Sequence, residues 1–130
     1  MAHPNEELVR QGYKAFGEGD METLRSLFTP DAVHSATGNG PLAGDYKGVD
    51  DILAYYGKLF ELSEGTFTAE LKSTKVEGDD TVVATHRDKG QRGGKTLDQD
   101  ETLTFTISGG KFTHLVEDHS DQAAYDAFWS

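Results

Sequence analysis

The hydrophobic period changes once along this chain of 130 residues, and that change constrains the fold more than any other feature. Before Gly65, apolar side chains recur every three to four residues, as they do on one face of a helix. After Gly65 they alternate with polar side chains, as in a strand with one buried face. Helices followed by antiparallel strands indicate an α+β layout, with the helices packed on one face of a bent sheet.

Three helices are predicted in the first half of the chain. Asn5 can cap the first helix, which ends at Gly17 and Gly19. Asp20 can cap a second, short helix, and a third begins near Val49. The three apolar stripes consist of Leu8, Val9, Gly12, Tyr13 and Phe16; of Met21, Leu24, Leu27 and Phe28; and of Val49, Ile52, Leu53, Tyr56, Leu59 and Phe60.

The other segments are predicted to be strands, turns and one last helix. A turn at 29–31 precedes a short strand at 32–36 and a glycine-rich loop at 38–48. Further strands are expected at 67–72, 81–87, 97–107 and 112–119, with turns at 78–80, 90–95 and 109–110 and a short aromatic helix at 121–129. We expect one domain, 1–130: a cone-shaped α+β barrel whose N-terminal helices pack on a strongly curved, mainly antiparallel sheet. Such a sheet leaves a blind pocket, a usual place for a small ligand.

Composition excludes several classes of function. The net charge of −11 repels phosphate backbones and therefore disfavours nucleic-acid binding. The chain contains no cysteine, which rules out disulfides, zinc–thiolate sites and thiol catalysis. No apolar run approaches the roughly 20 residues of a membrane helix. The first residues lack the charged and apolar regions of a signal peptide, so we expect a cytoplasmic protein.

Seven short motifs follow one another in an informative order. They are Tyr13-Lys14-Ala15-Phe16, Gly19-Asp20, Leu27-Phe28, Asp31-Ala32-Val33, Tyr46-Lys47-Gly48, Gly110-Lys111-Phe112 and Asp121-Gln122-Ala123-Ala124-Tyr125-Asp126-Ala127-Phe128-Trp129. Over essentially the whole chain this order resembles the SnoaL-like polyketide cyclases, a group within the nuclear-transport-factor-like superfamily. The resemblance implies the fold described above. It does not name a reaction, because isomerases, cyclases, epoxide hydrolases, dehydratases and binding domains share this architecture.

Only parts of the catalytic arrangements known in that superfamily match this sequence. The catalytic tyrosine of ketosteroid isomerases falls at Gly12, one place from Tyr13, and their general base falls at Ala36. Their protonated oxyanion acid falls near Glu101, which is still a carboxylic acid. Steroid isomerisation is therefore not expected.

Two other arrangements match in part near the end of the chain. Limonene-type epoxide hydrolases use an arginine flanked by two acidic residues. Arg87 matches the arginine and Glu117 matches one acid, but Lys89 occupies the position of the other acid. The cyclases use an acid near the end of the last strand, a role that Glu117 or Asp118 could fill.

Glu101 is the least expected residue in the sheet, because it lies on the apolar face of its strand with Leu103, Phe105 and Ile107. A carboxyl group there is unfavourable unless it is paired or protonated, so we expect it to line the pocket. Glu117 and His119 share a face, and such a pair could orient the imidazole or lower the pKa of the carboxylate. The alternative is a solvated strand end that caps the last helix.

His34 and Arg87 complete the predicted catalytic set. Alternation places His34 with Ala32 and Ala36, which the resemblance implies face the cavity, where it could act as base or acid. Arg87 could stabilise an anionic oxygen. The alternatives are a structural histidine, and a salt bridge of Arg87 to Glu101 or Glu117.

The sequence also indicates which histidines are exposed and which residues bind the ligand. His86 and His114 are expected to be exposed. No metal is expected, because the five histidines show no HExxH or other tight ligand spacing, and no cofactor is expected either. The residues expected to bind the ligand are Tyr13, Tyr56, Phe105 and Leu115.

Two functions from different classes fit these observations. One is a cofactor-independent enzyme that uses general acid–base chemistry on an apolar, oxygenated molecule such as a polyketide or terpenoid. In it, His34 or the Glu117–His119 pair would take a proton next to a carbonyl, and Arg87 with protonated Glu101 would stabilise the oxyanion. The other is a non-catalytic small-molecule binding or scaffolding domain. A homodimer is expected, because the outer face of the sheet is flat and rich in threonine.

Overall fold

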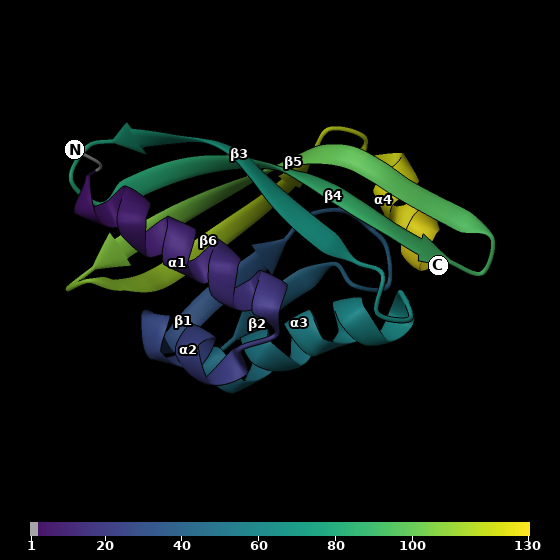
Figure 1. The fold of residues 1–130 in the computed structure, drawn as a ribbon. Helices are drawn as coiled ribbons and strands as arrows, with labels where there is room; N and C mark the ends of the chain where they lie inside the picture. Colours follow the sequence, from purple (N-terminus) through teal and green to yellow (C-terminus); the bar gives the residue numbers. More distant parts are fainter. Residues whose placement is uncertain (1–2) are drawn as a thin grey trace.

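The computed structural model describes residues 3–130 and shows four helices on a six-stranded sheet (Figure 1). The elements are α1 (Pro4–Glu18), α2 (Met21–Leu27), β1 (Phe28–Ala36), β2 (Gly44–Lys47), α3 (Val49–Leu62), β3 (Thr68–Glu77), β4 (Thr81–Arg92), β5 (Lys95–Ser108), β6 (Lys111–His119) and α4 (Gln122–Trp129).

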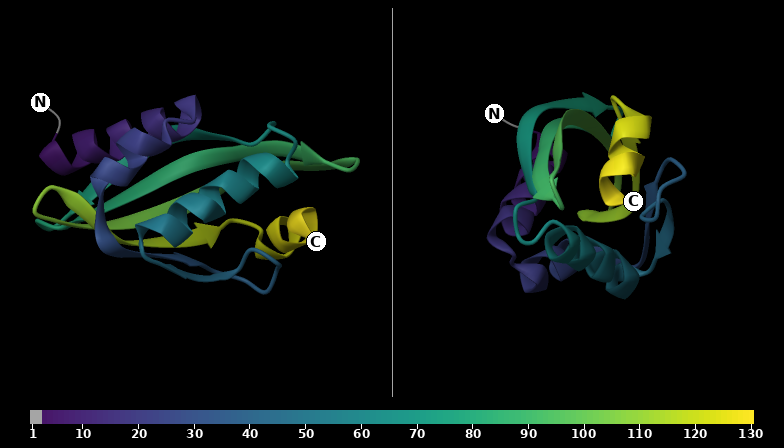
Figure 2. Two further views of the ribbon diagram at one scale, coloured as in Figure 1. Left: turned by 90° about the horizontal axis from the view of Figure 1, so that it is seen from below. Right: turned by 90° about the vertical axis from the view of Figure 1, so that its right-hand side faces the viewer.

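The sheet has the strand order β2-β1-β6-β5-β4-β3 and is mostly antiparallel. Its one parallel pairing joins β1 to β6, so strands from the two halves of the chain are neighbours inside the sheet. The end-on view in Figure 2 shows the strands curling around an interior that α1 and α3 help to enclose. The curl does not close, because β2 and β3 remain as edges. The predicted α+β fold is confirmed.

Local sequence explains where the helices begin and end. The first helix is capped by His3 rather than by the predicted Asn5: the His3 side chain accepts the backbone N–H of Asn5, and Pro4 occupies the first turn. This helix continues through Gly17 and stops where Gly19 adopts a left-handed conformation, with φ 68°. The predicted start of α2 is confirmed, because Asp20 accepts the N–H of Thr23.

Most strands are longer than predicted, and one strand, β2, was not predicted. The first runs through the expected turn at 29–31, where its pairing with β6 is irregular between Phe28 and Val33. A short strand, β2, lies inside the expected loop at 38–48. The turn expected at 90–95 is limited to Gly93 and Gly94, both with positive φ, so β4 and β5 extend to its edges.

The last helix lies at the same end of the molecule as the β4–β5 turn (Figures 1 and 2). Arg92 donates to the carbonyl of Phe128, and Lys95 donates to that of Ala127. On the other side, Asp126 accepts the backbone N–H of Asn39. These contacts fix α4 across one end of the interior, where the side chains of Tyr125, Phe128 and Trp129 are buried.

The core fills the space between the concave face of the sheet and the helices, and alternation along the strands supplies it. Along β5, odd-numbered side chains from Leu97 to Ile107 are buried, whereas even-numbered ones lie outside or at the boundary. Within residues 3–130, no helix has the length and hydropathy needed to cross a membrane.

Candidate active site

A cavity lies between the concave face of the sheet and helices α1 and α3. Its volume is about 70 Å³, more than the roughly 10–15 Å³ that a cavity needs to hold one water molecule. Its wall consists of Gly12, Tyr13, Phe16, Leu24, Phe28, His34, Tyr55, Tyr56, Leu59, Phe67, Ala69, His86, Glu101, Leu103, Phe105, Phe112, Leu115, Glu117 and Tyr125. The four residues expected to bind the ligand are all in this wall; their binding role stays a prediction.

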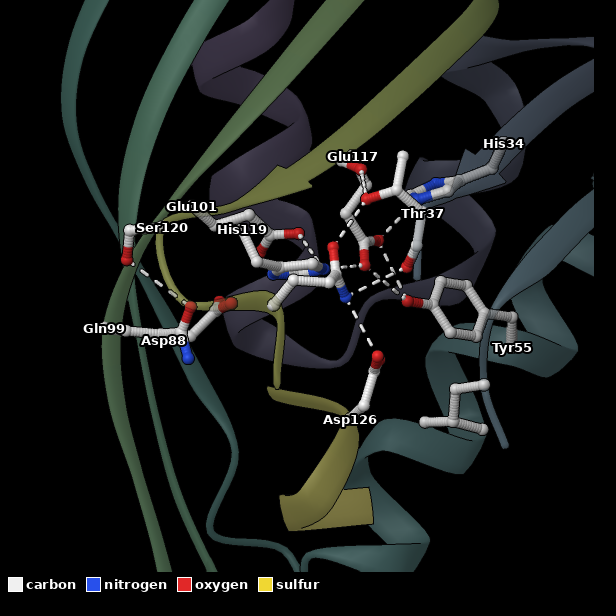
Figure 3. A network of polar contacts seen from close by, with 12 residues as sticks. His34, Thr37, Tyr55, Asp88, Gln99, Glu101, Glu117, His119, Ser120 and Asp126 are labelled. Atoms are coloured by element: carbon white, nitrogen blue, oxygen red, sulfur yellow. Dashed lines mark hydrogen bonds and ion pairs between the residues drawn. The ribbon is translucent and has the colours of Figure 1, made fainter. Parts of the chain in front are cut away.

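A buried carboxylate, that of Glu117 on β6, is the centre of one polar group (Figure 3). Its Oε1 atom accepts hydrogen bonds from Nε2 of His34 at 2.7 Å and from the hydroxyl of Tyr55 at 2.9 Å. Its Oε2 atom accepts one from Nε2 of His119 at 2.7 Å. The parallel pairing of β1 with β6 brings His34 beside Glu117, although 83 positions separate them in the sequence.

The environment of Glu117 favours its ionised form. Burial opposes ionisation, yet the hydrogen bonds and charges of His119 and His34 outweigh it and hold the pKa of Glu117 far below its usual value. A carboxylate can only accept hydrogen bonds, so Nε2 of His34 carries a hydrogen. The Nδ1 atom of the same ring lies 2.9 Å from the hydroxyl of Tyr56 and is assigned as its acceptor.

A second polar group surrounds His86 on β4. Its Nε2 atom lies 2.8 Å from Oδ1 of Asp88 and 2.5 Å from Oε2 of Glu101. Its Nδ1 atom lies 2.5 Å from the hydroxyl of Tyr13 on α1. Asp88 is completely buried, and its other oxygen, Oδ2, has no hydrogen-bond partner. A contact from Glu101 Oε1 to His119 Nε2, at 3.7 Å, links the two groups.

Glu101 and Glu117 are shifted in opposite directions. Burial, followed by the charges of Asp88 and Glu117, raises the pKa of Glu101 well above its usual value, so it favours the protonated form. The prediction that Glu101 faces the pocket is confirmed. Burial and the nearby carboxylates also raise the pKa of Tyr13, Tyr55 and Tyr56, which keeps their hydroxyl groups available as donors.

The predicted cavity position of Arg87 is wrong, and so is the predicted exposure of His86. In the β4–β5 pair, His86 is opposite Glu101 and Arg87 is opposite Asp100. Directly paired residues share a face, so His86 points inward with Glu101 and Arg87 points outward. Arg87 binds Asp98 and Asp100 rather than Glu101 or Glu117, at 2.7 and 3.2 Å.

The other predicted residues lie largely as expected. His34 and Glu117 line the cavity, and His114 is exposed. The His119 side chain is fully buried, but it stacks on the ring of Tyr125 behind the wall instead of facing the cavity. Asp118 points away from the interior and is exposed.

Sequence reasoning missed His86, Asp88 and Tyr55. The signal for the first two was present: Arg87 and Lys89 lie on one face of the strand, and two cations favour the solvent face. The two-residue turn at Gly93 and Gly94 also fixes the register that brings His86 opposite Glu101. Tyr55 adjoins Tyr56 in a helix, and its contact with Glu117 depends on packing that no local pattern reveals.

Two groups of side chains have ligand atoms close enough together for a metal ion. They are His86, Asp88 and Glu101, and Glu101, Glu117 and His119, with ligand atoms within 4.8 Å of one another in each group. In both groups an imidazole nitrogen is hydrogen-bonded to a carboxylate that would be its co-ligand. The absence of a metal and of a cofactor stays a prediction.

The chain is similar to one family model and to known proteins over most of its length. The family model described as a SnoaL-like domain matches residues 9–115. The uncharacterized protein Rv0034 of Mycobacterium tuberculosis (strain ATCC 25618 / H37Rv) is 37% identical over 124 residues, which cover 95% of each chain. Bal32a, from a soil-derived mobile gene cassette, is 38% identical, with a TM-score of 0.95 over 98% of this chain and 97% of its own.

A third relative has the same architecture. A protein of unknown function with a cystatin-like fold, from Xanthomonas campestris, is 30% identical, with a TM-score of 0.89. The match covers 95% of this chain and 96% of that one. The likeness in all three cases extends over nearly the whole chain.

Proposed function

This chain belongs to the SnoaL-like domain family, whose fold is that of a small-molecule-binding pocket domain, and we propose that it is a cofactor-independent acid–base enzyme. Its substrate is an apolar, oxygenated molecule of polyketide or terpenoid type. The observation that carries this proposal is the pair of cavity carboxyl groups, Glu117 and Glu101, whose pKa values move in opposite directions. When the surroundings move the pKa values of two carboxyl groups apart in this way, one group is held ionised and the other protonated.

His34 is the proton acceptor in this proposal, and Glu117 positions it. The carboxylate of Glu117 accepts a hydrogen bond from Nε2–H of His34, which leaves Nδ1 as the basic atom of the ring. The negative charge of the carboxylate stabilises the imidazolium that forms when Nδ1 takes a proton. Glu117 itself is a poor acceptor, because both of its oxygens already receive hydrogen bonds and its pKa is low. The hydroxyl of Tyr56 lies 2.9 Å from Nδ1, and the proposal requires it to turn away when the substrate enters.

Glu101 supplies the complementary donor. A proton next to a substrate carbonyl moves to Nδ1 of His34. The electrons of the broken C–H bond form a C=C bond, and the π electrons of the carbonyl move onto its oxygen to give an enolate. The protonated carboxyl group of Glu101 donates a hydrogen bond to that oxyanion, a kind of contact typically worth about 3 kcal/mol. Arg87 takes no part, because it lies on the outer face.

A non-catalytic binding or scaffolding domain is the second candidate. The observation in its favour is that the ionisable groups of the wall are already bonded to one another, which gives a stable polar lining without any reaction. The convergence of His34, Glu101 and Glu117 on one cavity supports the enzyme instead, although most of the cavity surface is apolar and Arg87 is absent from it.

Exchange of carbon-bound hydrogen for deuterium distinguishes these two functions. Acetophenone, cyclohexanone and acetylacetone, incubated with the protein in D₂O, are expected to lose their α-proton signals faster than in buffer. His34→Gln should reduce that acceleration by about 10² or more. The control is His114→Gln, which changes an exposed histidine on β6. Saturable binding without accelerated exchange would assign the protein to the binding class.

Three properties of the whole protein are also proposed. It forms a homodimer through the threonine-rich outer face of the sheet, works in the cytoplasm, and binds no nucleic acid. The charge of −11 supports the last of these. Sedimentation at high concentration tests the first, and a strictly monomeric profile would contradict it.

A further inference from the structure

The polar group around His86 contains a fully buried carboxyl group, that of Asp88. Asp88 is completely buried, and within residues 3–130 its side chain makes one hydrogen bond, from Oδ1 to Nε2 of His86 at 2.8 Å. The other carboxylate oxygen is unpartnered. Because an isolated buried carboxylate is strongly unfavourable, an ionised Asp88 needs a cation, and the imidazole of His86 is the group in contact with it.

The two nitrogens of His86 meet partners of different kinds. Nε2 lies between two carboxyl groups, those of Asp88 and Glu101, and therefore carries a hydrogen. Nδ1 meets the hydroxyl of Tyr13, which can either donate or accept. The charge on the ring decides which: a neutral ring takes the Tyr13 hydrogen, whereas an imidazolium donates to the Tyr13 oxygen.

We propose that Asp88 and His86 form a buried ion pair that turns the hydroxyl hydrogen of Tyr13 into the cavity, where it binds the ligand's oxygen beside Glu101. Tyr13 lines the cavity, so its hydroxyl can reach a ligand there. His86 and Asp88 are positioning residues, with Asp88 behind the wall. The inference rests on the proposed function for its site and adds that the preferred ligand presents an uncharged acceptor oxygen, such as that of a ketone.

The cavity wall supports an uncharged ligand over an anion. It contains no lysine or arginine. The ring nitrogens of His34 and His86 all have partners already, so no free cationic donor remains for a carboxylate. Both oxygens of ionised Glu117 are also occupied, which removes the obvious partner for an ammonium group.

Nitrogen-15 NMR of the ligand-free protein tests the ion pair. Both ring nitrogens of His86 are expected to resonate as N–H nitrogens, with the signals assigned through His86→Gln. In Asp88→Asn, Nδ1 should lose its proton, because the amide keeps the hydrogen bond and removes the charge. Asp100→Asn, which changes the outward carboxylate opposite Arg87, is the matched control. An unprotonated Nδ1 in the wild-type protein would overturn the proposal.

Two ligands of similar shape test whether the Tyr13 hydroxyl donates a hydrogen bond to the ligand. Acetophenone has a carbonyl oxygen, and ethylbenzene has none. Tyr13→Phe should weaken acetophenone binding by roughly five-fold and leave ethylbenzene unchanged. Asp88→Asn should give the same selective loss although Tyr13 is intact, which a merely structural role would not produce. Tyr46→Phe, outside the cavity wall, is the control.

The outcomes separate this inference from the proposed function. Equal losses for both probes, or none for acetophenone, would overturn the donor role of Tyr13. If neither probe binds, the NMR result alone decides. The protein could fail to accelerate deuterium exchange while His86 is protonated on both nitrogens and Tyr13→Phe weakens only acetophenone binding. That combination would support this inference and contradict only the catalytic proposal.

Discussion

Nε2 of His34 lies 2.7 Å from Oε1 of Glu117, and both side chains are buried. The contact crosses the one parallel pairing of the sheet, between β1 and β6. It joins a residue in the first strand to one in the last, so the chain must complete its fold before the pair exists. The local helices and hairpins can form without it.

Replacing Glu117 by Gln is expected to destabilise the protein by about 3 kcal/mol, because it leaves buried histidines without their charged partner. Urea unfolding followed by circular dichroism measures this free energy. Asp118→Asn, an exposed neighbour on the same strand, serves as the control and should leave the midpoint unchanged. Equal midpoints for both variants would contradict an energetic role for the buried carboxylate.

Glu117 and Glu101 should contribute to stability in opposite pH ranges. The folded pKa of Glu117 is lowered, so its contribution is present above the unfolded value and is lost as the pH falls through the folded value. The folded pKa of Glu101 is raised, so the folded state retains a proton that the unfolded chain releases. Its contribution is present below the unfolded pKa and is lost as the pH rises.

Unfolding at two pH values isolates the Glu101 contribution. Between about pH 5 and about pH 8, the free energy of unfolding of Glu101→Gln should rise relative to wild type, because Gln has no proton to lose. Asp100→Asn should keep a constant difference from wild type. A constant difference for Glu101→Gln as well would mean that its carboxyl group is not held in the protonated form.

Arg87→Ala should have little effect on the cavity. The side chain lies outside, where it binds Asp98 and Asp100 at the solvent boundary, and exposed ion pairs contribute little to stability. Acetophenone affinity is expected to stay at the wild-type value, whereas Tyr13→Phe lowers it. If Arg87→Ala lowered the affinity as much as Tyr13→Phe does, Arg87 would contribute to ligand binding and the prediction would be wrong.

Gly38 is expected to be necessary for docking of α4. It has a φ of 109°, and an added Cβ would lie 2.3 Å from Nε2 of Gln122. Gly38→Ala should therefore lower the free energy of unfolding by more than about 1 kcal/mol and change the fluorescence of Trp129. Gly57→Ala, in open space on α3, should instead raise it by about 0.5–1 kcal/mol. Opposite signs for the two variants check the prediction.

The sequence determined the helices, most of the strands and the inward position of Glu101. Those features are local: apolar stripes fix which face of a helix is buried, and alternation assigns Glu101 to the face of Leu103 and Phe105. The expected turn at 90–95 was too long, so the register of the β4–β5 hairpin remained open. Without that register, alternation separates His86 from Arg87 but does not say which of them faces inward.

Only the tertiary structure decided which polar groups meet. Tyr13, His86 and Glu101 come from a helix and two strands, and Tyr55 reaches Glu117 across 62 positions of sequence. Such contacts depend on how the sheet curls and where the helices cross it, neither of which a local period encodes. The direction of each pKa shift follows from the same packing, because burial and neighbouring charge are properties of the folded chain.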